Sequence, residues 1–145
     1  MRSLAIWMFL FALASAPAAA KDESVDELKS RAQNALPQDR PGLCVQIAQL
    51  QLHSADKLYI DGKVEQARTA VEDVVAYSEK ARDSAKETKK HLKNVEIAVR
   101  KMAEKLKDIK RTLAFEDQPP VEHAIERLED VRTSLLKEMF KKEKK

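Results

Sequence analysis

The sequence predicts an all-α fold, an elongated antiparallel bundle of helical hairpins, and three observations favour it. The first is composition, since the chain has only two glycines and 35% charged residues, and it is rich in the good helix formers Ala, Glu, Lys and Leu. The second is a heptad run over residues 64–113. The third is a set of shorter amphipathic segments on both sides of that run, which supply partner helices.

The heptad run is the element on which we expect the rest of the chain to pack. Its stops are the positions reached by alternating steps of three and four residues. The apolar stops are Val64, Ala67, Val71, Val74, Ala81, Ala85, Leu92, Val95, Val99, Met102, Leu106, Ile109 and Leu113. Ser78 and Thr88 are the two polar stops, and no Gly or Pro interrupts the run. The pattern therefore predicts one helix of about 50 residues, roughly 75 Å long, which needs partner helices to bury its stripe.

Three shorter helices are predicted near residues 24–36, 41–60 and 119–140. The apolar residues of the first and last segments follow one helical face. Those of the middle segment spread over most of its circumference, so we expect more than one neighbour to cover it. The tail at residues 141–145 holds only Lys and Glu, and we expect it to be disordered.

Local signals indicate where these helices begin and end. Ser24 and Glu27 have the spacing of a capping box, and Pro37 should end the helix that follows. Pro41 suits the first turn of the next helix, and Gly62 suits the left-handed position after its end, so a tight antiparallel hairpin follows. This hairpin resembles one tetratricopeptide-type unit at Ala55, Leu58, Tyr59, Gly62, Ala67, Val71 and Val74. The resemblance implies the geometry of the hairpin and carries over no function.

Residues 1–20 have the pattern of an export signal, with Arg2, an apolar stretch and three alanines before the expected cut after Ala20. An uncleaved anchor is the alternative. We therefore expect a single helical domain over residues 21–140 in a bacterial periplasm or outside the cell. Cys44 is the one cysteine, which excludes an internal disulfide framework. We expect it to be a buried small side chain, with an intermolecular disulfide as the alternative.

Motifs for catalysis or metal binding are missing from the sequence. His53, His91 and His123 stand on three different predicted helices, whereas a zinc site needs three or four ligands at fixed spacing. With two glycines the chain has no Gly-rich phosphate loop. We therefore expect a non-enzymatic protein that holds no metal and no cofactor.

The lengths of the flanking helices predict a thinly covered middle in the heptad run. The helix at 41–60 should reach back to about residue 83, and the helix at 119–140 to about residue 93. Small side chains mark this region as a strip for docking a protein partner or a second copy of the chain, at Ser78, Ala81, Ala85 and Thr88. The function that we expect is protein–protein interaction or scaffolding.

Basic residues on the outer positions of the run support an alternative, contact with a polyanion such as an anionic envelope surface. The residues are Lys86, Lys90, Lys93, Arg100, Lys107 and Arg111. Acidic residues interleave with them, so the other interpretation is a solvated face with internal ion pairs. No aromatic side chain lies among these bases to stack on a nucleobase, which argues against a nucleic-acid partner.

Overall fold

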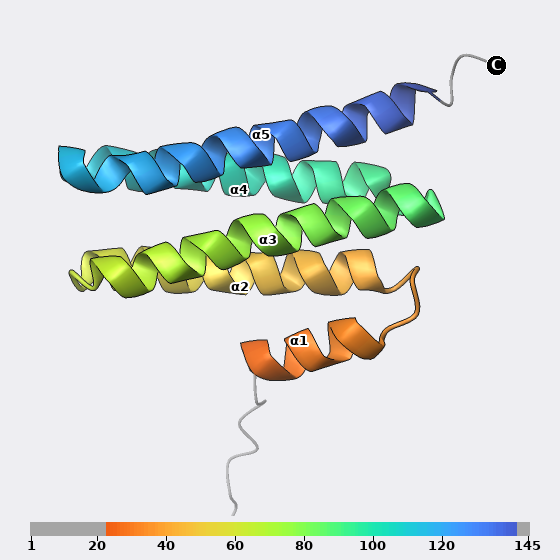
Figure 1. Cartoon of the computed structure of the whole chain (residues 1–145), viewed down its shortest axis with the longest axis horizontal. Helices are drawn as coiled ribbons and strands as arrows, with labels where there is room; N and C mark the ends of the chain where they lie inside the picture. The colour runs from red at the N-terminus through yellow and green to blue at the C-terminus, as the bar shows by residue number, and fades with distance from the viewer. Residues whose placement is uncertain (1–22, 142–145) are drawn as a thin grey trace, which may run out of the picture.

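The computed structural model describes residues 23–141, and these residues are all-helical (Figure 1). The elements are α1 (Val25–Asn34), α2 (Arg40–Ile60), α3 (Val64–Thr88), α4 (Leu92–Thr112), a 3-10 turn η1 (Phe115–Asp117) and α5 (Gln118–Lys141). The predicted all-α bundle is confirmed. The expected export signal at residues 1–20 and residues 142–145 of the expected tail lie outside the described residues, while Lys141 ends α5.

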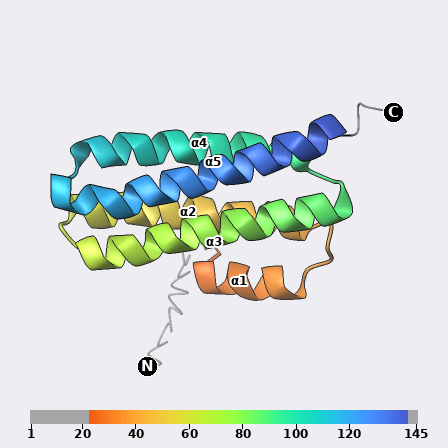
Figure 2. The same ribbon diagram turned by 45° about the horizontal axis from the view of Figure 1, so that its top comes forward.

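Helices α2 to α5 form an up-and-down four-helix bundle built from two hairpins. α2 pairs with α3 and α4 pairs with α5, and the hairpins stack so that α3 lies beside α5 and α2 beside α4 (Figures 1 and 2). α1 packs on α2, on the side of the molecule away from α5. All five helices contribute fully buried side chains to one core cluster, among them Leu28, Ile47, Val74, Leu106 and Leu128.

The prediction of one helix over residues 64–113 is wrong, because the chain reverses between α3 and α4. Lys89 (φ 58°) and His91 (φ 64°) both take the left-handed backbone conformation, which costs a residue with a side chain roughly 1–2 kcal/mol. Reversal lets α4 bury Leu92, Val95 and the rest of its stripe in the same core as α3. Burial of one large apolar side chain contributes about 1.5–3 kcal/mol, so long-range packing outweighs the strain of the turn.

The heptad spacing nevertheless predicts correctly which residues are buried. Every apolar stop of the run is buried or half-buried, and so are Ser78 and Thr88. The spacing of apolar residues decides which side of a helix is apolar. Each helix then packs that side against the core, whichever residue the helix begins at. The periodicity therefore indicated the core and missed the break.

The other predicted helix ends agree with the structure to within a few residues. The Ser24 hydroxyl accepts the Glu27 amide at 3.2 Å, and Pro41 lies in the first turn of α2. Gly62 has φ 75°, and its amide and that of Lys63 donate to carbonyl groups in the last turn of α2. This double hydrogen bond is a Schellman motif, and it joins α2 and α3 as the predicted antiparallel hairpin. As predicted, α2 has more than one neighbour: α1, α3 and α4.

Candidate functional site

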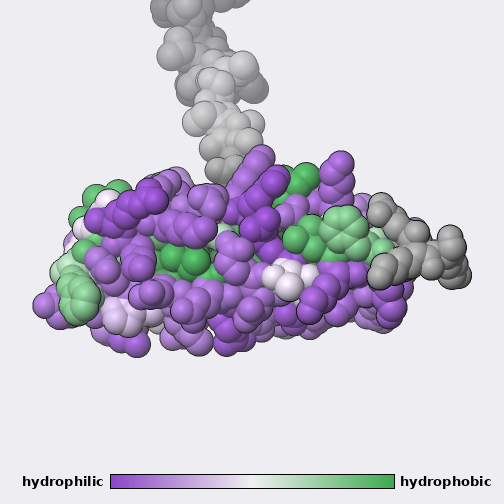
Figure 3. Space-filling model, turned by 90° about the horizontal axis from the view of Figure 1, so that it is seen from above, coloured by the Kyte–Doolittle hydropathy of each residue, from purple (hydrophilic) through white to green (hydrophobic). Residues whose placement is uncertain are grey.

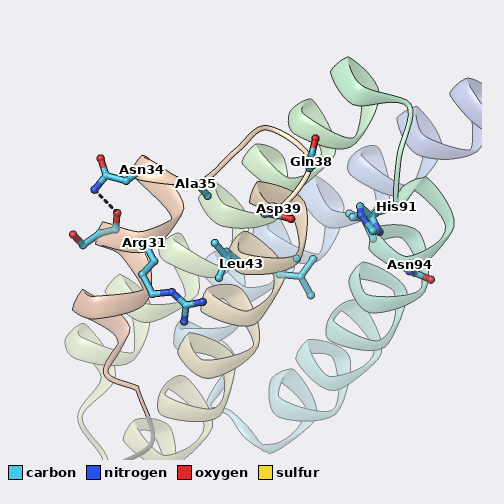
Figure 4. Close-up of a pocket in the computed structure, with 12 residues that line it drawn as sticks. Arg31, Asn34, Ala35, Gln38, Asp39, Leu43, His91 and Asn94 are labelled. Carbon is cyan, nitrogen blue, oxygen red and sulfur yellow. Dashed lines mark hydrogen bonds between the residues drawn. The ribbon is translucent and has the colours of Figure 1, made fainter.

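A groove of about 800 Å³ lies at one end of the bundle, between α1 and the start of α4 (Figure 4). Arg31 and Asn34 of α1 form one wall, and His91 and Asn94 at the start of α4 form the other. Leu43 of α2 lies between the walls. The turn between α1 and α2 closes the end of the groove, and the remaining lining residues are Ser30, Ala35, Gln38, Asp39, Gly42, Val45 and Val95.

The wall formed by α1 is tied to the bundle at its C-terminal end and at its middle. At its C-terminal end, the Arg40 guanidinium donates to the carbonyl oxygens of Ala32 (3.3 Å) and Ala35 (3.2 Å), which the helix itself leaves without partners. Pro37 lies in the turn that follows, and it prevents α1 from running on into α2. These contacts fix the C-terminal end of α1 on the start of α2, at the corner of the groove.

A half-buried polar cluster anchors the middle of α1. Lys29 of α1 donates to the Asp73 carboxylate of α3 at 2.8 Å, and Gln51 of α2 donates to the same oxygen at 2.7 Å. Burial raises the pKa of Asp73, but the hydrogen bonds from Lys29 and Gln51 outweigh it and leave the pKa below its ordinary value. The hydrogen bond to Asp73 raises the pKa of Lys29. One carboxylate therefore joins three helices, and no part of the sequence analysis indicated it.

The groove presents amide groups around an apolar floor. Asn34, Gln38 and Asn94 are exposed, while Leu43 and Val45 are half-buried. Asn34 donates to the Ser30 carbonyl of its own helix at 3.1 Å (Figure 4). An amide side chain can both donate and accept hydrogen bonds, so this set suits a ligand that carries donors and acceptors of its own.

The N-termini of α2 and α4 both lie at this end of the bundle. Their cap residues, Asp39 and His91, make no side-chain cap hydrogen bond within the described residues. The first amides of α4 therefore lack intrahelical partners beside the groove. These amides add donors to the wall that already carries Asn94.

The predicted docking strip lies inside the bundle. Ser78, Ala81 and Ala85 are 0% exposed, and Thr88 is half-buried. Both hydroxyl groups donate within α3, Ser78 to the Val74 carbonyl at 2.7 Å and Thr88 to that of Ser84 at 2.8 Å. Other helices of the same chain cover these residues, so a partner reaches them only if the bundle opens.

The six predicted polyanion contacts are spread over α3, the following turn and α4. Lys86 is half-buried and donates to Ser134 at 3.1 Å. Lys107 lies 3.1 Å from Glu104 and 3.7 Å from Glu129, and Arg111 pairs with Asp108 at 2.9 Å. The other three are exposed: Lys90, Lys93 and Arg100. The structure therefore divides the set into three side chains that have a partner, of which Arg111 is also exposed, and three exposed side chains without an ion pair within residues 23–141.

Histidine and cysteine are dispersed in the described part of the chain. His53 lies in α2, His91 before α4 and His123 in α5. Between residues 23 and 141 no three His, Cys, Asp or Glu side chains are grouped closely enough to hold a metal ion. Cys44 is buried, as expected, and it lines a cavity of about 230 Å³ with Ala32 of α1 and Tyr77 of α3. Burial raises the pKa of its thiol.

Comparisons of this chain with protein-family models, with curated proteins and with solved structures found no match. Of the helices in residues 23–141, none combines the length and the apolar character needed to cross a bilayer.

Proposed function

We propose that the protein is exported and binds a segment of another polypeptide in the groove between α1 and α4, as an interaction or scaffolding protein without catalytic activity. The observation that carries this proposal is the groove itself, with the amides of Asn34, Gln38 and Asn94 around the half-buried Leu43. Its volume of about 800 Å³ lies within the range of ligand pockets, about 300–1,000 Å³.

The chemistry of the walls favours a polypeptide. An extended segment carries one donor and one acceptor per residue, and these groups must find partners when water is removed. Side-chain amides supply both kinds of partner. The apolar surface of Leu43 and Val45 can cover one side chain of the bound segment, which adds specificity.

The rigidity of the groove supports binding as well. Arg40 and the Lys29–Asp73 pair hold α1 in place. A preformed site avoids part of the entropy loss that ordering a loop would add to binding.

A displayed library of random peptides, selected on the immobilised protein, tests this proposal. We expect Asn94→Trp, which fills the groove, to weaken binding of the selected peptides at least about tenfold, equivalent to about 1.4 kcal/mol. Lys93→Trp is the matched control, because Lys93 is the exposed neighbour of Asn94 and does not line the groove. Calorimetric titration measures both. Equal affinity for the two variants, or no selected peptide, contradicts the proposal.

A second candidate function is contact with a polyanion such as an anionic envelope surface. One observation favours it: Lys93, Arg100 and Lys101 are exposed on α4, and none has an ion pair among the described residues. The surface over α4 and α5 is mostly hydrophilic, with apolar side chains gathered in small patches (Figure 3). A polar, basic face can bind anionic headgroups without inserting into the bilayer.

Vesicles with and without anionic lipid test the second candidate. Binding should require the anionic lipid and should fade between low and physiological salt, because salt screens exposed charges. Lys93→Glu/Arg100→Glu should abolish it, whereas Lys63→Glu/Arg68→Glu at the opposite end of the bundle should not. Binding that is absent, or that both double variants lose equally, argues against this candidate.

A further inference from the structure

The turn between α3 and α4 has a strained backbone, and its sequence contains no residue that forces the helix to end there. Lys89 and His91 are left-handed without being Gly, the residue that adopts this conformation at no steric cost. His, like Asn and Asp, takes it more often than most residues do, whereas Lys has no such preference. No Gly or Pro lies anywhere between Gly62 and Pro119. Nothing in the local sequence therefore prevents residues 89–91 from continuing the helix.

The heptad register passes through this turn without a change of phase. Ala85 and Thr88 before it are followed by Leu92 and Val95 at the same alternating spacing of three and four. In a hairpin the turn resets the direction of each helix, so α3 and α4 need no common register. A common register is needed only where one continuous helix keeps a single apolar side along its whole length.

We infer that the chain can exchange its α4–α5 hairpin with a second copy, forming a dimer in which residues 64–112 are one helix. Domain exchange of this kind keeps the contacts of the monomer and changes only the hinge. Strain in a short hinge favours it, because the open form releases that strain.

The arrangement of the bundle fits this exchange. α3 and α4 occupy opposite corners, with α5 beside α3 and α2 beside α4 (Figures 1 and 2). Two continuous helices running antiparallel would place α3 of one copy across the core from α4 of the other, at both ends of the dimer. The Lys86–Ser134 hydrogen bond and the Arg127–Glu79 ion pair, which join α3 to α5, would then form between copies.

Contacts inside each hairpin would remain within one copy. The Arg132 guanidinium of α5 lies 3.1 Å from the Glu96 carboxylate of α4, and Asp73 of α3 accepts from Gln51 of α2. Each hairpin therefore moves as a preassembled unit. The partner is a second copy of this chain, and the surface that it covers is the core side of α2 and α3.

Two hinge variants separate backbone effects from side-chain effects. Lys89→Ala/His91→Ala and Lys89→Gly/His91→Gly remove the same side chains, including the ion pair of Lys89 with Glu138. Ala favours the continuous helix and is strained in the turn, whereas Gly relieves the turn and disfavours the helix. Lys93→Ala/Lys101→Ala is the matched control, because both residues are exposed in α4 outside the hinge.

The experiment is refolding from urea at high protein concentration, followed by size-exclusion chromatography with light scattering. We expect a species of twice the mass of the monomer. Its fraction should rise several-fold in the Ala hinge variant, fall several-fold in the Gly hinge variant and stay unchanged in the control. Equal fractions in the two hinge variants, or a monomer under every condition, overturn the inference.

A distance measurement identifies the exchanged form. Spin labels at Glu72→Cys and Asp108→Cys, in a Cys44→Ala background, occupy exposed positions about equally far from the turn. In one continuous helix the two positions are about 54 Å apart, whereas in the hairpin they lie at the same level of the bundle. Labelled chains diluted into unlabelled ones should give the long distance in the dimer. A short distance in the dimer overturns the inference.

Discussion

The turn between α2 and α3 and the turn between α3 and α4 each reverse the chain within a few residues, but different forces hold them. In the first, Gly62 takes the left-handed position, and two amides donate to carbonyl groups of Leu58 and Tyr59. In the second, Lys89 and His91 take that conformation against their steric preference. Local chemistry is enough to form the first turn, whereas the second depends on the core that it allows to assemble.

This difference shows how two similar turns can have different energetic origins. A Schellman turn around glycine would form in the isolated hairpin, because its hydrogen bonds and its backbone preference agree. At the turn around Lys89, the Lys90 amide donates to the Thr88 hydroxyl at 3.4 Å, which is a long hydrogen bond. The turn persists because α4 buries its apolar side against α2, α3 and α5.

Among substitutions in the two turns, that of Gly62 should change the free energy of unfolding most. We expect Gly62→Val to lower the free energy of unfolding by about 2 kcal/mol, because a β-branched side chain is strained at φ 75°. The urea midpoint, followed by circular dichroism, measures the loss.

Gly42→Ala is the matched control for this substitution. Gly42 lies in α2, and an added Cβ meets nothing within 4 Å there, as at Gly62. We expect the control to raise stability by up to about 1 kcal/mol, because alanine favours the helix. A Gly62→Val midpoint equal to that of the wild type would show that the first turn does not depend on its left-handed residue.

Substitution in the second turn should act in the opposite direction and more weakly. We expect His91→Gly to raise the free energy of unfolding of the dilute protein by about 0.5–1 kcal/mol. Relief of backbone strain exceeds the entropy that glycine adds to the unfolded chain. Lys93→Gly, two residues into α4, should instead lower stability by roughly the same amount. If both glycines destabilise equally in urea titrations, the strain assigned to His91 is absent.

The pH dependence of the second turn should give the smallest effect. Lys89 hydrogen-bonds to Glu138, and this bond lowers the pKa of Glu138 from its ordinary value of 4.5. Because the pKa is lower in the folded state, the pair stabilises the protein above pH 4.5, and this contribution disappears as pH falls through the lowered pKa.

Thermal unfolding between pH 3 and pH 7 tests this contribution. Glu138→Gln should flatten the melting-temperature profile in the acid range. Glu126→Gln removes an exposed acid of α5 that has no ion pair within residues 23–141, and it should leave that part of the profile unchanged. Identical profiles for the two variants would show that the Lys89–Glu138 pair contributes no pH-dependent stability.

The helices were predictable from sequence because their signals are local. Ser24, Pro41 and Gly62 act through their own backbone and a few neighbours, so each indicated a helix end correctly. The spacing of apolar residues also indicated the buried side of α3 and α4. Their separation was not predictable, because Thr88–Lys89–Lys90–His91 carries no breaker and the gain from reversal comes from residues far along the chain.

The groove was not predictable for a similar reason. Arg31 and Asn34 lie in the first helix and Asn94 near the start of the fourth, and only the packing of the bundle brings them together. None of these residues follows a motif with a fixed spacing. The one local signal near the site was the pair Pro37 and Pro41, which marked the corner between α1 and α2.

Cys44 gives the molecule a chemical reporter for the motion of its first helix. The thiol is 1% exposed and lines a small cavity with Ala32 of α1. A thiol reagent can reach it only when α1 swings away or the bundle unfolds. The alkylation rate of the native protein therefore reports how often α1 detaches or the bundle unfolds, and a ligand that bridges α1 and α4 would slow that rate.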